Sequence, residues 1–260
     1  MLIVYIICMN TFNPSAESDK IISFLKQTFE KTGKKKAVIN WSGGIDSTVS
    51  LYLLAKVLPP TNITVLHLPY EKTHEDEFLP IAELLQITKA QFHIISIKSM
   101  VDEIKTSLKI SDPFRLGNVM ARVRMVVAFD HAKKLNALVC GTENKTEHLL
   151  GYFTRFGDEA SDIEPIQHIY KTRIFELGEH LRIPNNILDV KPTAGLWEGQ
   201  TDEGEFGFTY EEADEVLFRY IDKSKTVEEI EKEGYRNAGK VIEYSKKNQF
   251  KHEVPYMISL

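Results

Sequence analysis

Four short apolar runs alternate with longer segments of helical character over residues 1–140, and this alternation limits the fold more than any other feature. The runs are rich in strand-forming residues and predict strands at 36–41, 62–68, 91–97 and 136–140. The segments around them predict helices at 15–32, 46–58, 75–85, 99–108 and 116–135. Such alternation builds βαβ units, and continuous apolar strands indicate a parallel sheet with helices on both faces. The sequence therefore predicts an α/β fold with a doubly wound, Rossmann-like parallel sheet.

The length of 260 residues fits one domain, which we expect to span residues 15–260, with charged helices over 210–249. Residues 1–14 are then an N-terminal extension. Its apolar start, residues 1–8, is either a start-site artefact or an extra edge strand. This run is too short to cross a bilayer and lacks the basic region and cleavage site of a signal peptide, so we expect no membrane partner.

Charge and cysteine content narrow the partners further. The net charge is -5 and the isoelectric point about 5.9, whereas nucleic-acid-binding surfaces usually show a basic domain or stripe. We therefore expect no nucleic acid partner, and any bound polyanion should be small. Cys8 and Cys140 form neither a disulfide framework nor a zinc pattern, which fits a reducing cytoplasm. Cys140 ends an apolar run and is predicted to be a small buried hydrophobe.

The stretch SGGIDS, residues 42–47, joins the first predicted strand to a helix. Gly43 and Gly44 permit a tight turn and close backbone approach, and N–H groups at the helix start would face an anion. The lysine of a Walker A loop is absent, and Asp46 would repel phosphate unless Mg²⁺ lay between them. The loop thus predicts a magnesium-bound polyphosphate. A plain strand–helix turn, with Asp46 as a helix-start charge, is the alternative.

This loop resembles the SGGxDS signature of the ATP pyrophosphatases, enzymes that cleave ATP between its α and β phosphates. The superfamily includes NAD, GMP, asparagine and argininosuccinate synthetases and tRNA-thiolating enzymes, and the loop alone does not choose among them. Longer stretches are similar to ammonia-dependent NAD synthetases and occur in the same order: 117–125, 141–166, 170–172 and 192–207. The resemblance runs from about Gly33 to Lys251, almost the whole chain.

The resemblance implies an adenine nucleotide alpha hydrolase-like variant of the Rossmann-like fold and a ligase that amidates nicotinic acid adenine dinucleotide (deamido-NAD⁺) with ammonia. ATP would be the co-substrate and Mg²⁺ the cofactor, and an acyl-adenylate would lead to NAD⁺, AMP and pyrophosphate, the last step of NAD biosynthesis. A cytoplasmic homodimer with its substrate site at the interface is also implied. Glutamine-dependent relatives carry an added amidase domain for which this chain has no room, so free ammonia or a partner chain is expected.

Two alternatives remain open. One is another ATP-pyrophosphatase ligase, either GMP synthetase-like or tRNA-thiolating. The other is a non-catalytic nucleotide-binding protein on the same fold, because a fold does not determine function.

The catalytic residues implied by the resemblance are Asp46, Glu147, Lys171 and Asp158. Glu143 and Glu147 share a helix face, and spacing alone lets either reach a metal beside Asp46. The resemblance chooses Asp46 and Glu147 for the metal and leaves Glu143 as a solvated charge. Lys171, placed just before a helix, would contact ATP phosphate although lysines are usually exposed. Asp158 would lie near the ammonia pocket.

ATP binding is implied for the glycine loop and three later motifs, namely Ser42, Gly43, Gly44, Asp46, Ser47, Thr142, Lys171 and Thr193. Thr142 is expected at the carboxyl end of the fourth strand, where open α/β sheets bind ligands. Residues 189–209 have little periodicity, and their glycines suit a loop that closes over the reactants.

Deamido-NAD⁺ binding is implied for four charged residues, namely Arg122, Arg155, Asp162 and Lys251. Arg124 lies two positions from Arg122, points to nearly the opposite side of its helix, and is expected in a structural ion pair. The chain departs from the family at two places. Arg155 replaces the usual lysine, and Phe250 stands where a histidine is usual, with His252, two residues later, as a substitute.

Overall fold

The computed structural model describes residues 12–71, 75–190 and 201–258, and its centre is a four-stranded sheet in which all pairs are parallel. The strands are β1 (Ala37–Asn40), β2 (Ile63–His67), β3 (Phe92–Ile94) and β4 (Leu138–Cys140), in the order β3-β2-β1-β4. Ala37 lies opposite Ile63 on one side and Leu138 on the other, which sets the register. The chain adds β2 and β3 on one side of β1 and then crosses to the other side for β4.

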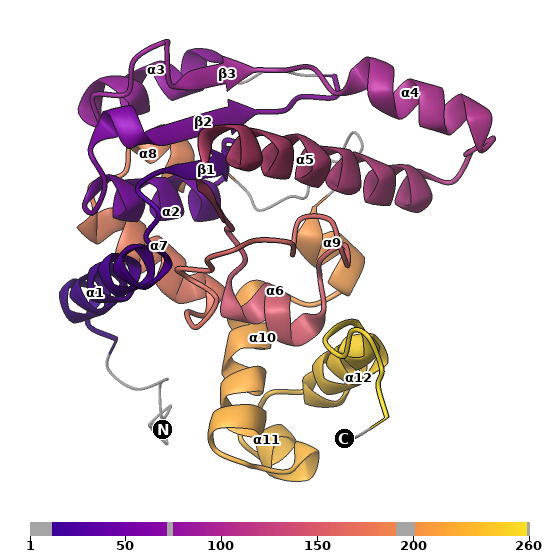
Figure 1. The fold of residues 1–260 in the computed structure, drawn as a ribbon. Coiled ribbons are helices and arrows are strands. Elements are labelled where there is room, and N and C mark those ends of the chain that lie inside the picture. The colour runs from indigo at the N-terminus through magenta and orange to yellow at the C-terminus, as the bar shows by residue number, and fades with distance from the viewer. Residues whose placement is uncertain (1–11, 72–74, 191–200, 259–260) are drawn as a thin grey trace.

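Helices cover both faces of this sheet (Figure 1). One core is shared with α1 (Pro14–Thr32), α2 (Ile45–Ala55), α3 (Glu75–Leu84) and α7 (Lys171–His180). The other is shared with α4 (Lys98–Ser107) and α5 (Pro113–Leu135). Ile39 faces the first core and its neighbour Val38 the second, and both are fully buried. Alternate side chains enter opposite cores, so the strands are apolar throughout, and the predicted doubly wound fold is confirmed.

The C-terminal helices form a further layer with its own core (Figure 1). Its elements are α9 (Asp202–Phe206), α10 (Tyr210–Leu217), a π-helical turn (Phe218–Asp222), α11 (Val227–Lys232) and α12 (Ala238–Asn248). Short elements elsewhere are α6 (Lys145–Leu150), α8 (Asn185–Leu188) and 3-10 turns at Pro60–Asn62 and Gln249–Lys251. Leu150 of α6 and Tyr170, just before α7, belong to the C-terminal core. The helices that follow β4 therefore join the two layers.

Several elements differ from the predictions in their bounds or in their presence. The N-cap of α1 is Asn13, whose side chain accepts the Ala16 N–H at 3.1 Å. The predicted start of this helix, Ser15, lies two residues after this cap. The strand predicted over 91–97 pairs only over three residues. The segment 189–209, predicted to be irregular, contains α9. Residues 1–11 of the predicted extension lie outside the described residues.

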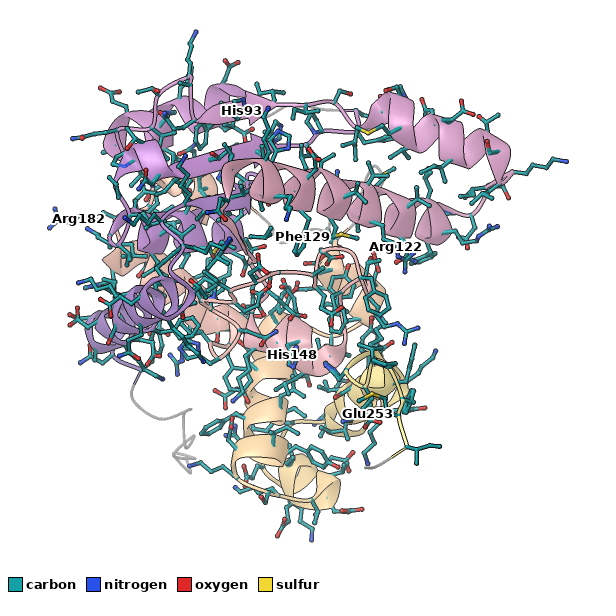
Figure 2. The ribbon with its side chains drawn as sticks, in the orientation of Figure 1. His93, Arg122, Phe129, His148, Arg182 and Glu253 are labelled. Atoms are coloured by element: carbon teal, nitrogen blue, oxygen red, sulfur yellow. The ribbon has the colours of Figure 1, made fainter. Side chains whose placement is uncertain are left out.

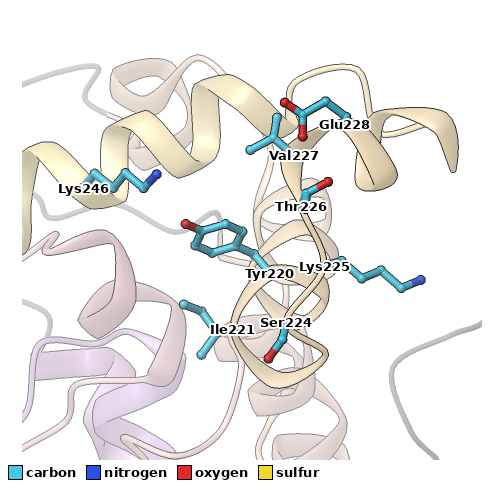
Figure 3. A pocket seen from close by; sticks show the side chains of 8 residues that line it. All are labelled: Tyr220, Ile221, Ser224, Lys225, Thr226, Val227, Glu228 and Lys246. Atoms are coloured by element: carbon cyan, nitrogen blue, oxygen red, sulfur yellow. The ribbon is translucent and has the colours of Figure 1, made fainter.

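An open hollow of about 590 Å³ lies among the C-terminal elements (Figure 3). Its lining comes from the π-helical turn, the loop after it, α11 and α12: Tyr220, Ile221, Ser224, Lys225, Thr226, Val227, Glu228 and Lys246. It includes none of the residues that the sequence singled out. Concavity alone therefore does not locate the functional site, and the chemistry of the side chains has to.

Candidate active site

The glycine loop and the segment after β4 lie at the carboxyl ends of two adjacent parallel strands, β1 and β4. The strand order reverses between these strands, and in open α/β sheets such a switch point is where ligands bind. Figure 1 shows α6 and α7 between the sheet and the C-terminal helices. The sheet, the helices α6 and α7, and the C-terminal helices thus meet at this edge of the sheet.

The glycine loop folds tightly onto the start of α2. Gly43 has a φ of 90°, in the left-handed region that glycine adopts without strain. The buried Ser47 hydroxyl donates to the Gly44 carbonyl at 3.0 Å, and the buried Thr48 hydroxyl donates to the same carbonyl at 2.9 Å. The N-cap residue of α2, Gly44, has no side chain to cap the helix, and the first N–H groups of a helix lack partners within it. These N–H groups and the exposed Ser42 hydroxyl can therefore face an anion.

The Lys171 ammonium lies between the two carboxylates that the resemblance assigned to a metal. Its Nζ donates to Asp46 Oδ2 and lies 3.6 Å from Glu147 Oε1. Lys171 is the first residue of α7, not a residue before it, and only 2% of it is exposed. Asp46 and Lys171 are 125 residues apart in the chain, so the fold alone brings the group together.

Asn144 ties Asp46 to Glu147. Its side-chain amide donates to Asp46 Oδ1 at 2.9 Å, and its Oδ1 accepts the Glu147 N–H at 3.0 Å. Glu147 Oε2 in turn accepts the Asn144 N–H at 3.4 Å, which completes a capping box at the start of α6. Sequence reasoning missed Asn144, although an Asn-x-x-Glu spacing before a helix is a readable sign of this cap.

Burial and charge set the ionisation of this group. Burial raises the pKa of Glu147 well above its usual range, and the Asp46 charge raises it further while Lys171 opposes both. Burial alone would lower the pKa of Lys171, but Asp46 and Glu147 outweigh it and hold that pKa above its usual value. The lysine therefore stays charged at neutral pH and can hold an anionic ligand.

The donor set limits which metal could bind. Within the described residues, no cluster of three or more His, Cys, Asp and Glu side chains is arranged to hold a metal ion. Asp46 and Glu147 nevertheless fit Mg²⁺, because both carboxylates converge on one cation, the Lys171 ammonium. This ion usually takes one or two protein carboxylates and completes its shell with water and substrate phosphate.

Glu143 is buried, so the prediction of a solvated charge is wrong. Its exposed fraction is 6%. Oε2 accepts a hydrogen bond from the Gln167 amide at 2.6 Å and lies 3.2 Å from His148 Nδ1. Oε1 is buried with no hydrogen-bond partner among the described residues. The contact partners come from sequence positions up to 24 residues away, which local spacing does not reveal. Of the two glutamates, only Glu147 lies beside Lys171.

Glu164 contacts the backbone of Glu143, and its carboxyl group has a raised pKa. Its Oε2 accepts the Glu143 N–H at 3.1 Å and its Oε1 accepts the Ser161 hydroxyl at 2.7 Å. Burial raises the pKa of Glu164 to about 8, with Ser161 opposing and the Glu143 charge adding to the rise. Glu164 is therefore mostly protonated in the folded protein at neutral pH.

We expect Glu164→Gln to stabilise the protein in mild alkali and to have little effect in mild acid. An unfolded glutamate titrates near 4.3, so from about pH 5 to about pH 8 the folded state binds the extra proton and stability falls as pH rises. Glutamine has no such titration, and we expect a gain of roughly 2 kcal/mol in unfolding free energy at about pH 8, discounted for partial exposure. Urea unfolding at about pH 5.5 and about pH 8 measures it. Equal differences at both values would contradict the displaced pKa.

Arg122, in the middle of α5, contacts the backbone of Arg155, the other arginine assigned to the dinucleotide. Arg122 lies on the side of α5 toward the loop that follows α6 (Figure 2), and its Nη2 donates to the Arg155 carbonyl at 3.1 Å. The Arg155 guanidinium lies 5.5 Å from the centre of the Phe250 ring. Phe250, at the position where a histidine was expected, thus borders one of the proposed substrate contacts. Arg124 donates to the Leu68 carbonyl at 3.1 Å, so its principal partner is a backbone oxygen and not the expected ion pair.

The other substrate-side residues are held by backbone contacts. Lys251 Nζ donates to the Gly151 and Phe153 carbonyls at 2.7 and 2.9 Å. Asp162 Oδ2 accepts the Val139 N–H of β4 at 2.8 Å, which leaves Oδ1 for a ligand. Asp158 is exposed, and its Oδ1 accepts the Thr154 N–H at 2.9 Å. Lys251 and Asp158 are close enough for their charges to interact.

Three further residues complete the surroundings of Lys171. Asp202 is 3% exposed and accepts the Tyr152 and Tyr210 hydroxyls at 3.1 and 2.9 Å. The Tyr210 ring centre lies 5.3 Å from Lys171 Nζ. Sequence reasoning gave these residues no role.

Of the two threonines predicted to bind ATP, Thr142 is half-buried and lies two residues beyond β4, whereas Thr193 lies outside the described residues.

Comparison with known proteins decides the family. Residues 17–255 match the family model described as NAD synthase, which is nearly the whole chain. The chain belongs to the NAD synthase family. An NH(3)-dependent NAD(+) synthetase of Fusobacterium nucleatum is 40% identical over 244 residues, 93% of this chain and 95% of that protein. The fold and the family that the sequence predicted are thus both confirmed.

Solved structures of NAD synthase relatives superpose on this fold. The NMN synthetase from Francisella tularensis has a TM-score of 0.82 and 32% identity, over 96% of this chain and 100% of that one. The NH3-dependent NAD synthetase from Campylobacter jejuni has a TM-score of 0.79 and 25% identity, over 95% and 100%. The two names differ in the nucleotide that is made. A search of the described part of this chain for a helix long and apolar enough to cross a membrane found none.

Proposed function

We propose that this chain catalyses the ATP-dependent amidation of deamido-NAD⁺ by ammonia and yields NAD⁺, AMP and pyrophosphate. One observation carries the proposal. In a chain of the NAD synthase family, Asp46, Glu147 and Lys171 converge beside a glycine loop at the switch point of the sheet. That arrangement suits a phosphate-bearing substrate, and the family supplies the reaction.

The reaction has two steps. The nicotinate carboxylate is a poor electrophile, so one of its oxygens first attacks the α-phosphorus of ATP, and pyrophosphate leaves. The product is an acyl-adenylate. Ammonia nitrogen then bonds to the carbonyl carbon, the bond from that carbon to the AMP oxygen breaks, and the nitrogen loses a proton. AMP departs with the electron pair, and the amide of NAD⁺ remains.

The protein contributes positioning and charge. The loop residues Ser42, Gly43, Gly44 and Ser47, with Thr142 and Thr193, would bind ATP and hold the departing pyrophosphate through N–H groups and hydroxyls. Lys171 would exchange its carboxylate partners for phosphate oxygens. Mg²⁺, held by Asp46 and Glu147 together with phosphate, would offset negative charge at the phosphorus.

The second substrate would occupy the surface next to α5. Arg122, Arg155, Asp162 and Lys251 would bind deamido-NAD⁺, with Arg155 in a bidentate contact that lysine does not make. Asp158 would stand beside the entering ammonia, which is either free or delivered by a partner chain. Solvent can reach the Asp158 side chain, although desolvation by its surroundings raises the pKa of its carboxyl group.

A second candidate is the same amidation on the mononucleotide, which would give nicotinamide mononucleotide. It is favoured by the NMN synthetase whose structure superposes with a TM-score of 0.82. The chemistry at Asp46, Glu147 and Lys171 would be unchanged, and only the contacts to the distant adenylyl half of the substrate would differ.

One assay tests the function. The protein is supplied with ATP, Mg²⁺, ammonium and either deamido-NAD⁺ or nicotinic acid mononucleotide, and AMP and the amidated product are measured. We expect both products at a higher kcat/KM with the dinucleotide. A higher value with the mononucleotide would select the second candidate. AMP without amide would indicate another acceptor, and no AMP would exclude the enzyme.

We also propose a cytoplasmic homodimer with the dinucleotide site at its interface. Helices α4 and α5 extend side by side beyond the sheet (Figure 1), and exposed apolar side chains lie on them or directly after α4: Met100, Leu108, Phe114 and Val126. Exposed apolar residues gathered in one region favour a protein interface. Sedimentation equilibrium measures the mass, and a monomer at micromolar concentration would contradict the proposal.

A further inference from the structure

The N-terminus of α7, which carries Lys171, is capped from outside the helix. The preceding residue, Tyr170, makes no side-chain cap, so the first N–H groups of α7 need other acceptors. The Thr146 hydroxyl oxygen accepts the Lys171 N–H at 2.9 Å, and Asp214 Oδ2 accepts the Thr172 N–H at 2.8 Å. The Thr146 hydroxyl in turn donates to Asp214 Oδ1. One carboxylate on α10 therefore satisfies both N–H groups, one of them through Thr146.

We propose that Asp214 is a positioning residue, which holds the helices that carry Glu147 and Lys171 in the relative position that the reaction needs. This inference rests on the proposed function. Asp214 touches neither phosphate nor substrate in this role. It acts on the backbone of α7 directly and on α6 through Thr146, the residue next to Glu147.

The burial of this network makes it a fixed support. Asp214 and Thr146 are fully buried and Lys171 is 2% exposed, so water cannot replace a lost acceptor. Hydrogen bonds to a buried carboxylate are stronger than neutral ones and leave a costly unpaired donor when removed. A negative charge at the start of α7 also complements the helix dipole.

The same helix reaches Lys171 a second time. Tyr210 and Asp214 lie four residues apart on α10, hence on one face, and the Tyr210 ring centre is 5.3 Å from Lys171 Nζ. Helix α10 thus contacts the backbone at α7 through Asp214 and the Lys171 side chain through Tyr210. The C-terminal layer therefore contacts the Lys171 end of α7 directly, through both its backbone and its side chain.

The first test compares kinetics of three variants. At nearly constant volume, Asp214→Asn replaces one acceptor oxygen by an amide group, and Thr146→Val removes a hydroxyl that both accepts the Lys171 N–H and donates to Asp214. Thr146→Ser retains the hydroxyl. We expect the first two to lower kcat about 10- to 100-fold, because displacement by about 1 Å is costly in catalysis, with the KM for ammonium little changed. We expect Thr146→Ser to stay within about threefold of wild type.

Val241→Ala is the matched control for lost stability. Val241 is fully buried in the C-terminal core and outside the network. We expect this variant to have a lower Tm and an unchanged kcat for the folded protein. A wild-type kcat for Thr146→Val, or a kcat for Asp214→Asn that falls only as far as that of Val241→Ala, would overturn the positioning role.

A second measurement does not depend on turnover. In the ligand-free protein, amide hydrogen exchange at Lys171 and Thr172 should be at least about tenfold faster in Asp214→Asn than in wild type, with the end of α7 unchanged. Unchanged exchange at both N–H groups would overturn the proposal. An inactive wild-type protein would contradict the proposed function alone, because the exchange result still decides whether Asp214 holds α7.

Discussion

Asp46→Asn is expected to lower NAD⁺ formation about 1,000-fold while the protein stays folded, since charge stabilisation at the reacting phosphate is lost. In the wild type, the Asn144 side-chain amide donates to Asp46 Oδ1 at 2.9 Å. Asparagine at position 46 keeps an oxygen that can accept this hydrogen bond, but it lacks the negative charge that faces Lys171. Lys171 retains Glu147 at 3.6 Å, so the buried ammonium still has an opposite charge. Initial rates of NAD⁺ and AMP formation at saturating ATP and Mg²⁺ measure the loss.

The effect belongs to the first chemical step, so isotope exchange between pyrophosphate and ATP should fall together with NAD⁺ formation. Asp19→Asn, an exposed aspartate on α1, is the matched control and should keep wild-type rates. Far-UV circular dichroism and Tm confirm that both variants fold. Rates for Asp46→Asn within about tenfold of wild type would remove this carboxylate from the catalytic group.

The sheet and its ligand-binding edge could be predicted because their signals are local. Each strand is a short apolar run whose neighbouring residues face different cores, as Val38 and Ile39 do. The glycine loop also carries its signal locally, in Gly43 and in the serines around it. Asn144 could have been found by the same means, because it lies only three positions before its capping-box partner Glu147.

Burial and long-range contacts could not be predicted in this way. Lys171 resembles a surface lysine in sequence and is buried only because α2 and α6 bring two carboxylates to it. The sequence predicted Glu143 and Glu147 on one helix face, but Glu143 precedes the N-cap of α6, and its partners, such as Gln167, differ from those of Glu147. Asp214 acts on Thr146 from 68 residues away, so no spacing rule indicates the contact. Family resemblance supplied the proposed roles of Asp46, Glu147 and Lys171, while the residues that support them required the fold.

Lys171→Met is expected to lose activity about 1,000-fold and also to destabilise the ligand-free protein. Methionine fills the same buried space without charge, so Asp46 and Glu147 lose the ammonium that lies between them. Removal of one member of a buried ion pair costs about 3–5 kcal/mol when the partner charge stays behind. Urea unfolding without ligands at neutral pH measures the destabilisation, and initial rates of NAD⁺ and AMP formation measure turnover.

The double variant Lys171→Met with Glu147→Gln separates the two effects. With residue 147 neutral, its repulsion with Asp46 disappears, and we expect much of the lost unfolding free energy to return. Activity should not return, because a phosphate contact and a metal ligand are then both absent. In the single variant, Mg²⁺ without nucleotide should raise Tm more than in wild type, since no ammonium competes for the carboxylates. Equal Mg²⁺ shifts in the two proteins would contradict the assignment of Asp46 and Glu147 to the metal.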